Sequence, residues 1–309
     1  FVKTKGQHHA TLIHPIGAFT KDMSGEDLAE MYDMQNAGAI MFGDYKRGIV
    51  NANLLKIGLQ YAQDFNGKVV AYCNDSNIKG KGVVHEGVVA TKLGLKGIPS
   101  LSEEIILARN LFLLEYTGGN LHIPTISTAK SVELIKEAKI KGLNVTCSVA
   151  VHNLVFTDDV LVDFDTRFKV DPPIRDEHHR LALINGVLDG TIDVITSDHC
   201  AIDIEHKKME FDMAKNGTIG LESAFGALLA VLPLQVVIEK LQAAKNIFLN
   251  KESKIEIGAK ADLSLFNPDL EWTFTKDDIL SKSKNSAFLN QPMKGFVYGV
   301  FNNDQLIIK

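Results

Sequence analysis

The chain has 309 residues, 45% of them hydrophobic and 23% charged, with a formal net charge of −5. This composition suits a globular protein with a large buried core. The acidic balance and the lack of a basic block argue against a nucleic-acid partner, and no apolar run approaches the length of a membrane span. Three widely spaced cysteines indicate reduced thiols and a cytoplasmic location rather than a structural zinc site.

Strand and helix patterns alternate from residue 10 to about residue 245. The predicted strands are short, apolar on both faces and rich in β-branched residues, as parallel strands covered by helices are. They cover residues 10–16, 39–44, 68–73, 120–125, 144–151 and 193–198. Helices are predicted over residues 25–37, 104–116, 129–141, 176–189, 219–231 and 234–244. Capping boxes, Ser24 with Asp27 and Ser100 with Glu103, are predicted to open the first two helices.

Six strand–helix units predict an α/β fold of the (β/α)-barrel type. No glycine-rich phosphate turn follows a strand, which disfavours a doubly wound dinucleotide-binding sheet. A closed barrel needs eight strands, so two are either irregular or precede Phe1, and the helix-like start favours the second option. We therefore predict an N-terminally incomplete barrel over residues 1–250. Residues 251–309 are predicted as a β-sandwich portion with a connecting helix within 275–292 and a turn at Asn302-Asn303-Asp304.

Catalytic groups of a barrel lie at the carboxyl ends of its strands. The most informative end is that of the sixth predicted strand, where Asp198 precedes His199. A carboxylate there could take a proton from a metal-bound water, or it could cap a helix or anchor a loop. The first strand ends at His14-Pro15, and the next four ends present an acid, a phenol, a hydroxyl and an imidazole, at Asp44, Tyr72, Thr125 and His152.

Two further features favour a structural interpretation. His122 lies inside an apolar strand, and we predict a hydrogen-bonded core imidazole there. Residues 78–89 form a segment with several glycines and lysines after the third strand. This segment could clasp an anionic ligand, although a surface loop is the default interpretation.

Long motifs follow one another along the chain: HPIGAFTKDMSGEDLAEMYDMQNAGAIMFGD, KGIPSLSEEI, STAKSVELIKEAKIKGLNVT, FKVDPPIR, DGTIDVITSDH, GTIGLES, GAKADLSLFNPDLEWTF and SKNSAFLNQPMKGFVYG. In this order they resemble the dihydroorotase family, of the cyclic-amidohydrolase type found with aspartate carbamoyltransferase. The resemblance covers essentially the whole chain. It implies an amidohydrolase-type (β/α)8 TIM barrel with a β-sandwich formed by both chain ends. It also implies that two barrel strands precede Phe1.

The resemblance implies a binuclear zinc site whose ligands are only partly present. Two metal-binding histidines of the family align with Tyr72 and Thr125, and the paired histidines of the first family strand lie outside this chain. The bridging carboxylate aligns with Asp44, or with Tyr45 in a register one residue later. A zinc centre needs several fixed nitrogen and oxygen ligands, and a phenol or a hydroxyl is a poor substitute for imidazole.

The remaining family positions are better preserved. Asp198 occupies the position of the proton-transfer acid, and a histidine downstream of it in the family aligns with Ile202. His199 and His152 stand at positions implied to contact the substrate. Asp171 replaces the asparagine of the family's substrate-contacting Asn-Pro-Pro, which adds negative charge where an anionic dihydroorotate would bind.

Three functions are compatible with this pattern. The main hypothesis is a dihydroorotase-like protein of pyrimidine biosynthesis with a degenerate metal site, little or no activity, and a structural or assembly role. Its partners would be aspartate carbamoyltransferase or further copies of itself. The alternative is an active hydrolase that converts dihydroorotate to N-carbamoyl-aspartate, with a rearranged or mononuclear zinc site drawn from Asp44, His152, Asp198 and His199. The third is a metal-free binder of small molecules, with a pocket formed by Asp44, Tyr72, Thr125 and Asp171.

Overall fold

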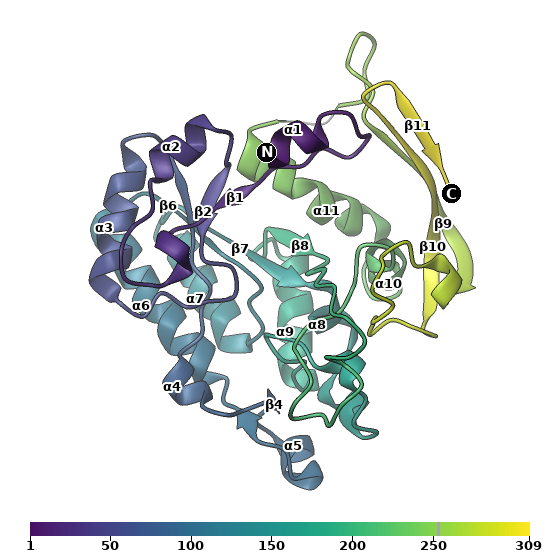
Figure 1. Cartoon of the computed structure of the whole chain (residues 1–309), viewed down its shortest axis with the longest axis horizontal. Helices are drawn as coiled ribbons and strands as arrows, with labels where there is room; N and C mark the ends of the chain where they lie inside the picture. Colours follow the sequence, from purple (N-terminus) through teal and green to yellow (C-terminus); the bar gives the residue numbers. More distant parts are fainter. Residues whose placement is uncertain (252–253) are drawn as a thin grey trace.

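The computed structural model describes residues 1–251 and 254–309, and its centre is a parallel β-sheet (Figure 1). Six strands lie in the order β1-β2-β3-β6-β7-β8, each parallel to its neighbour. They are β1 (Ile16–Gly17), β2 (Met41–Gly43), β3 (Lys68–Val70), β6 (Asn120–Ile123), β7 (Val145–Ala150) and β8 (Val194–Thr196). All six predicted strands are therefore present within the described residues, and they form an open half-barrel.

Helices that follow the strands cover the outer face of the half-barrel. These are α2 (Met31–Asn36), α3 (Ala52–Gln63), α6 (Leu101–Thr117), α7 (Ala129–Ile140) and α9 (Glu177–Leu188). Helix α3 packs on α6, α6 on α7, and α7 on α9, so the outer layer follows the order of the chain (Figure 1). The shared core includes Leu59, Leu107 and Ile135, none of which is exposed. None of the helices in the described parts combines the length and the apolarity needed to cross a bilayer.

The chain also forms several short helices. They are α1 (Val2–Gly6), α4 (Ser76–Lys79), α5 (Val88–Leu93), α8 (Val151–Val155) and α10 (Ala224–Leu229). The longer helix α11 (Leu234–Leu249) packs on β8 and α9. A separate two-stranded parallel sheet, β4 (Val84–His85) with β5 (Gly97–Ile98), lies within the segment after β3. The sequence pattern did not indicate this small sheet, because its strands are only two residues long.

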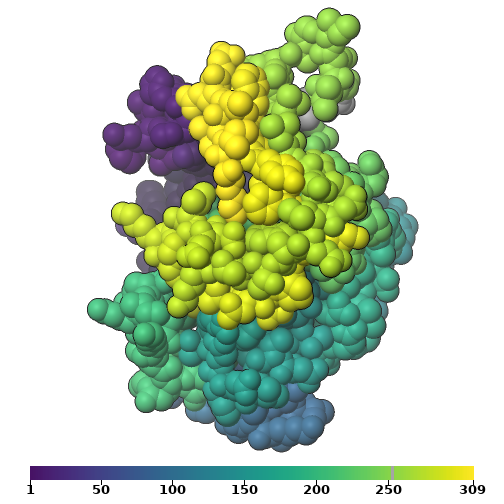
Figure 2. Space-filling model, turned by 90° about the vertical axis from the view of Figure 1, so that its right-hand side faces the viewer, coloured from purple at the N-terminus to yellow at the C-terminus, as the bar shows by residue number. Residues whose placement is uncertain are grey.

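A three-stranded antiparallel sheet ends the chain. Strands β9 (Leu263–Thr273), β10 (Pro292–Asn302) and β11 (Gln305–Ile308) lie in the order β11-β10-β9, and α10 packs on β10. Asn303 and Asp304 both have positive φ angles, which confirms the predicted turn. The Asn302 side chain donates to the carbonyl of Ala10, so the two chain ends lie side by side (Figure 2). The proposed domain boundary at residue 250 stays a prediction.

Several local predictions were wrong at their boundaries. The predicted strand 10–16 is a strand only from Ile16 onward. The predicted helix 25–37 is shortened to α2, and its N-cap is Glu30 rather than Ser24. Gly25 has a φ of 80°, and the Thr20–Leu28 bridge makes a loop of the intervening residues. The predicted helix 219–231 is reduced to α10, and the helix within 275–292 to a single 3₁₀ turn, Lys276–Asp278.

Gly58 in α3 lies against the ring of Phe19, and an added Cβ would overlap that ring. A glycine-to-alanine change inside a helix normally stabilises it by up to about 1 kcal/mol. Because both residues are buried here, we expect Gly58→Ala to lower the free energy of unfolding by about 1–3 kcal/mol instead. Urea denaturation measures this change. The exposed neighbour Gln60 supplies the control, since Gln60→Ala should leave stability nearly unchanged, and an equal result for both variants would contradict the packing argument.

Candidate functional site

Charged residues meet at the carboxyl ends of the parallel strands. Lys46 follows β2, and its ammonium lies 2.7 Å from Oδ2 of Asp198, which follows β8. The same ammonium donates to the backbone carbonyl of Asp171, in the loop before α9. The Lys46 and Asp198 side chains are 17% and 10% exposed. Asp198 thus occupies the predicted rim position, but its nearest partner is a lysine.

Asp171 forms the second half of this network. Its Oδ1 accepts a hydrogen bond of 2.9 Å from the Tyr72 hydroxyl at the end of β3. Its Oδ2 lies 2.6 Å from the ammonium of Lys79 in α4. Two lysines and two aspartates therefore compensate one another in charge across one rim. We call Lys46, Tyr72, Lys79, Asp171 and Asp198 the rim network.

Burial governs proton affinity in the rim network. Desolvation raises the pKa of Asp198, while the Lys46 ammonium opposes that rise. Desolvation, and then the Asp171 carboxylate, raise the pKa of the Tyr72 phenol well above its ordinary value. Tyr72 is therefore a protonated phenol at neutral pH in this structure, and it donates its hydrogen bond to Asp171.

The Asp44 carboxylate accepts hydrogen bonds from the loop that follows β1. Its Oδ1 accepts from the backbone amides of Phe19 and Thr20, at 2.9 and 3.0 Å, and its Oδ2 accepts from the Thr20 hydroxyl. Asp44 is buried, whereas the next residue, Tyr45, is 64% exposed. The carboxylate at the end of β2 therefore anchors a loop in this structure, and its role as a metal ligand stays a prediction.

Among the described residues, the side chains at the remaining strand ends do not come together as a group of potential metal ligands. Thr125 is buried with a φ of 46°, and its backbone amide donates to the hydroxyl of Ser148. His152 in α8 is fully buried, and neither ring nitrogen has a partner among the described residues. Burial lowers its pKa to about 3. Nδ1 of His199 faces the backbone amides of Gly220 and Leu221, each at 3.3 Å.

The residues at this rim do not fit the binuclear zinc site that the family resemblance implies. The two imidazole positions carry a protonated phenol and a threonine, the candidate bridging carboxylate already accepts three hydrogen bonds, and Asp198 is paired with an ammonium. Lys46 places a positive charge directly against the Asp198 carboxylate. Among the described residues, no three potential ligands of the predicted set Asp44, His152, Asp198 and His199 come within metal-binding distance of one another.

A cavity of about 1030 Å³ lies inside the half-barrel and reaches the rim, where Lys46, Tyr72 and Asp198 line it. Its wall combines the inner face of the sheet with α10 and α11, and it includes Val70, His122, Val194, Leu241 and Phe248. His122 is buried and its nitrogens lie 2.9 and 3.3 Å from the hydroxyls of Thr146 and Ser148. This confirms the predicted core imidazole.

Glu103 positions the loop after β6. Its carboxylate accepts from the amide and hydroxyl of Ser127, the amide of Thr128 and the hydroxyl of Ser131. The guanidinium of Arg175 lies 3.7 Å away, and both charged side chains are buried. The predicted capping box with Ser100 does not form, since Ser100 is helical and makes no side-chain cap bond. Glu103 therefore does not cap its own helix, and its carboxylate instead holds the loop after β6.

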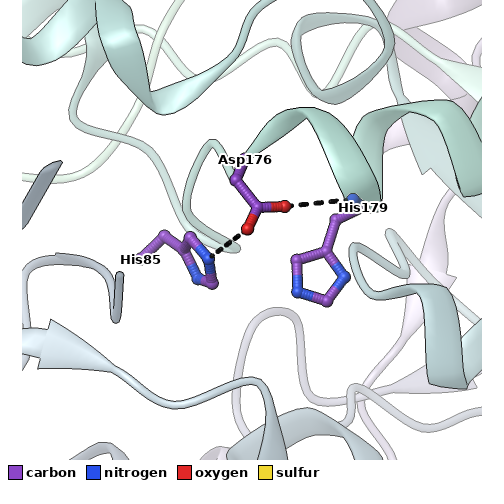
Figure 3. Close-up of side chains that lie close together, drawn as sticks. All are labelled: His85, Asp176 and His179. Carbon is purple, nitrogen blue, oxygen red and sulfur yellow. Dashed lines mark hydrogen bonds and ion pairs between the residues drawn. The ribbon is translucent and has the colours of Figure 1, made fainter. Parts of the chain in front are cut away.

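His85, Asp176 and His179 form a separate cluster at the start of α9, where the three side chains face one another (Figure 3). The donors around it disfavour a metal. Nδ1 of His179 accepts from the amide of Ala129 at 3.0 Å, and Nδ1 of His85 lies 3.2 Å from the guanidinium of Arg175. Neither donor can also accept, so each neutral ring carries its proton on Nε2, the nitrogen that a metal would need.

Comparison with known proteins places this chain in a family. A family model described as Dihydro-orotase-like matches residues 6–131. The chain is 40% identical to a dihydroorotase of Pelotomaculum thermopropionicum over 316 aligned residues, covering 100% of this chain and 74% of the relative. It is 38% identical to a dihydroorotase of Pelobacter propionicus, covering 92% of this chain and 68% of the relative.

The solved structures support the fold. An L-hydantoinase from Arthrobacter aurescens matches with a TM-score of 0.85 at 22% identity, covering 100% of this chain and 72% of that one. A D-hydantoinase matches with a TM-score of 0.77 at 19% identity, covering 94% and 67%. These likenesses show the α/β amidohydrolase fold, here a parallel half-barrel with a C-terminal antiparallel sheet. The sequence identities of 40% and 38% show that the chain belongs to the dihydroorotase family.

Proposed function

We propose that this member of the dihydroorotase family has little or no dihydroorotase activity and serves pyrimidine biosynthesis in a structural or assembly role. The observation that carries the proposal is the ion pair between Lys46 and Asp198. A proton-transfer acid must face a water that a metal activates, and here the acid faces an ammonium. Tyr72 and Thr125, at the aligned histidine positions, supply no replacement imidazole.

Metal analysis and turnover test this proposal directly. The purified chain is expected to hold much less than one zinc per chain and to open dihydroorotate no faster than a matched Asp198→Asn variant. The control is the dihydroorotase of Pelotomaculum thermopropionicum, prepared and assayed in parallel. About two tightly bound metals per chain, together with turnover that is lost in Asp198→Asn, would refute the proposal.

The second candidate is an active, metal-dependent cyclic-amide hydrolase. The specific observation in its favour is the identity of 40% to a curated dihydroorotase across the full chain, and the comparisons support it better than they support loss of activity. Such an enzyme would need zinc, and the donors at the rim would have to rearrange, because Asp44 and Asp198 are both engaged. Turnover that rises with added zinc would favour this candidate.

The partners of the chain are also a proposal. By family analogy they are aspartate carbamoyltransferase or further copies of this chain. Size-exclusion chromatography with light scattering, with and without purified aspartate carbamoyltransferase, separates the two. A third role, metal-free binding of a pyrimidine-like compound at Tyr72 and Asp171, predicts a thermal shift with such compounds in the absence of metal, and the Tyr72→Phe variant should reduce that shift.

A further inference from the structure

Each of the two lysines of the rim network places its ammonium against a carboxylate that has little access to water. Lys46 and Lys79 each lie within 2.7 Å of one carboxylate oxygen, of Asp198 and Asp171 respectively. The carboxylate side chains are 10% and 13% exposed. A carboxylate with so little access to water is costly unless a positive charge compensates it. At Asp198 a metal would supply that charge in a zinc site, and in this chain Lys46 supplies it. Asp171 stands where the family has an uncharged asparagine, and Lys79 compensates the charge that it adds.

We propose that Lys46 takes over at Asp198 the charge compensation that a metal provides in the family site, and that Lys79 compensates the negative charge that Asp171 adds, so that ion pairs rather than a bound metal hold the rim together. The proposal extends the proposed function and rests on the same loss of metal ligands, but it concerns cohesion of the rim and not turnover. It assigns to each lysine one carboxylate. The donor set argues in the same direction, because among the described residues the two aligned histidine positions carry Tyr72 and Thr125 instead of imidazoles.

Lysine suits this task because its ammonium is a compact charge with three donors. Lys46 uses two acceptors, the Asp198 carboxylate and the Asp171 carbonyl. These contacts join the end of β2 to the end of β8, across 152 residues of sequence, and to the loop before α9. Lys79 and Tyr72 join α4 and the end of β3 to the same aspartate. The rim network therefore connects five segments of an open half-barrel.

The first test compares thermal stability across matched lysine variants of the full chain. Lys46→Met and Lys79→Met should each lower Tm by about 5–10 °C, because each leaves a partly buried carboxylate uncompensated. Lys136→Met is the control, since Lys136 and its partner Asp189 are 57% and 41% exposed and also 2.8 Å apart. That variant should shift Tm by less than about 2 °C. Equal shifts for Lys46→Met and Lys136→Met would overturn the proposal.

The second test uses the unmodified chain, so it does not depend on any variant folding. Neither a chelator nor added zinc should move Tm by more than about 1 °C, because no metal binding is linked to folding. A drop in Tm with chelator, or a rise of several degrees with zinc, would overturn the proposal. The double variant Lys46→Met, Asp198→Asn removes both charges and should recover most of the Tm lost in Lys46→Met; no recovery would count against charge compensation.

Dihydroorotate turnover, measured on the same samples, separates the two proposals. Turnover with a metal-independent Tm would refute the loss of activity and leave the lysine replacement standing. A Tm that depends on zinc without turnover would refute the lysine replacement and leave the proposed function standing. Each of the two proposals is therefore refuted by a different result.

Discussion

Replacing Glu103 with alanine is expected to lower the free energy of unfolding by about 3–5 kcal/mol, the cost of breaking a buried ion pair from one side. The change removes the acceptor of two backbone amides and two hydroxyls and leaves the buried Arg175 without its carboxylate. Arg175 keeps its contact of 2.7 Å with the Ser127 hydroxyl, so its charge remains buried. Urea or thermal denaturation with a single transition measures the loss.

A second acid on α6 supplies the control for this experiment. Glu115 lies 3.4 Å from Lys141 and is 48% exposed, so Glu115→Ala should change stability by no more than about 1 kcal/mol. Adding Arg175→Met to Glu103→Ala should recover part of the loss, because the uncompensated cation is then removed. Similar losses for Glu103→Ala and Glu115→Ala would show that burial of Glu103 does not matter.

Acid is expected to destabilise the fold already as the pH falls below about 6.5, because its buried histidines are neutral. Burial lowers the pKa of His122 and of His152 to about 3, and of His85 and His179 to about 4, from the ordinary value of 6.5. Between those values the unfolded chain binds protons that the folded chain does not, so stability is complete above pH 6.5 and is lost as the pH falls. Each fully buried histidine contributes up to about 1.4 kcal/mol per pH unit.

His152 offers the sharpest variant for the pH experiment. Its ring nitrogens have no partner among the described residues, so His152→Leu removes a titrating group without breaking a hydrogen bond. The slope of the unfolding free energy against pH, measured from pH 7 to pH 5, should fall by up to one proton. The exposed His8 supplies the control variant, because His8→Leu changes the same residue type without removing a buried ring. An unchanged slope in His152→Leu would contradict the buried, neutral state of this ring.

The opposing contribution comes from Asp158. Burial and the nearby carboxylates of Asp159 and Asp176 raise its pKa to about 6, so the folded chain binds its proton first as the pH falls. This group therefore gains stability over part of the window in which the histidines lose it. Burial also raises the pKa of Asp198 and lowers the pKa of His14. The buried histidines still outnumber the carboxyl groups that oppose them, and the net effect of acid stays destabilising.

The sequence by itself determined the strands, the fold class and the family. Strand periodicity is local and needs only neighbouring residues, which explains why all six parallel strands were predicted, several of them to within two or three residues. Helix boundaries near the chain start were less predictable, because a loop bound by Asp44 shortens α2 and no local signal announces that contact. Glu103 shows the same effect, since a cap pattern was overruled by a partner 24 residues away.

Only the tertiary structure decided what the rim is made of. The sequence marked Tyr72 and Thr125 as unsuitable metal ligands, but it gave no sign that Lys46 would meet Asp198, 152 residues later, or that Lys79 would meet Asp171, 92 residues later. The lysines of the segment after β3 are compatible with binding of an anionic ligand. In the structure Lys79 of this segment instead binds the carboxylate of Asp171. Ion pairs of this kind depend on where strand ends converge in space, and spacing along the chain does not encode that convergence.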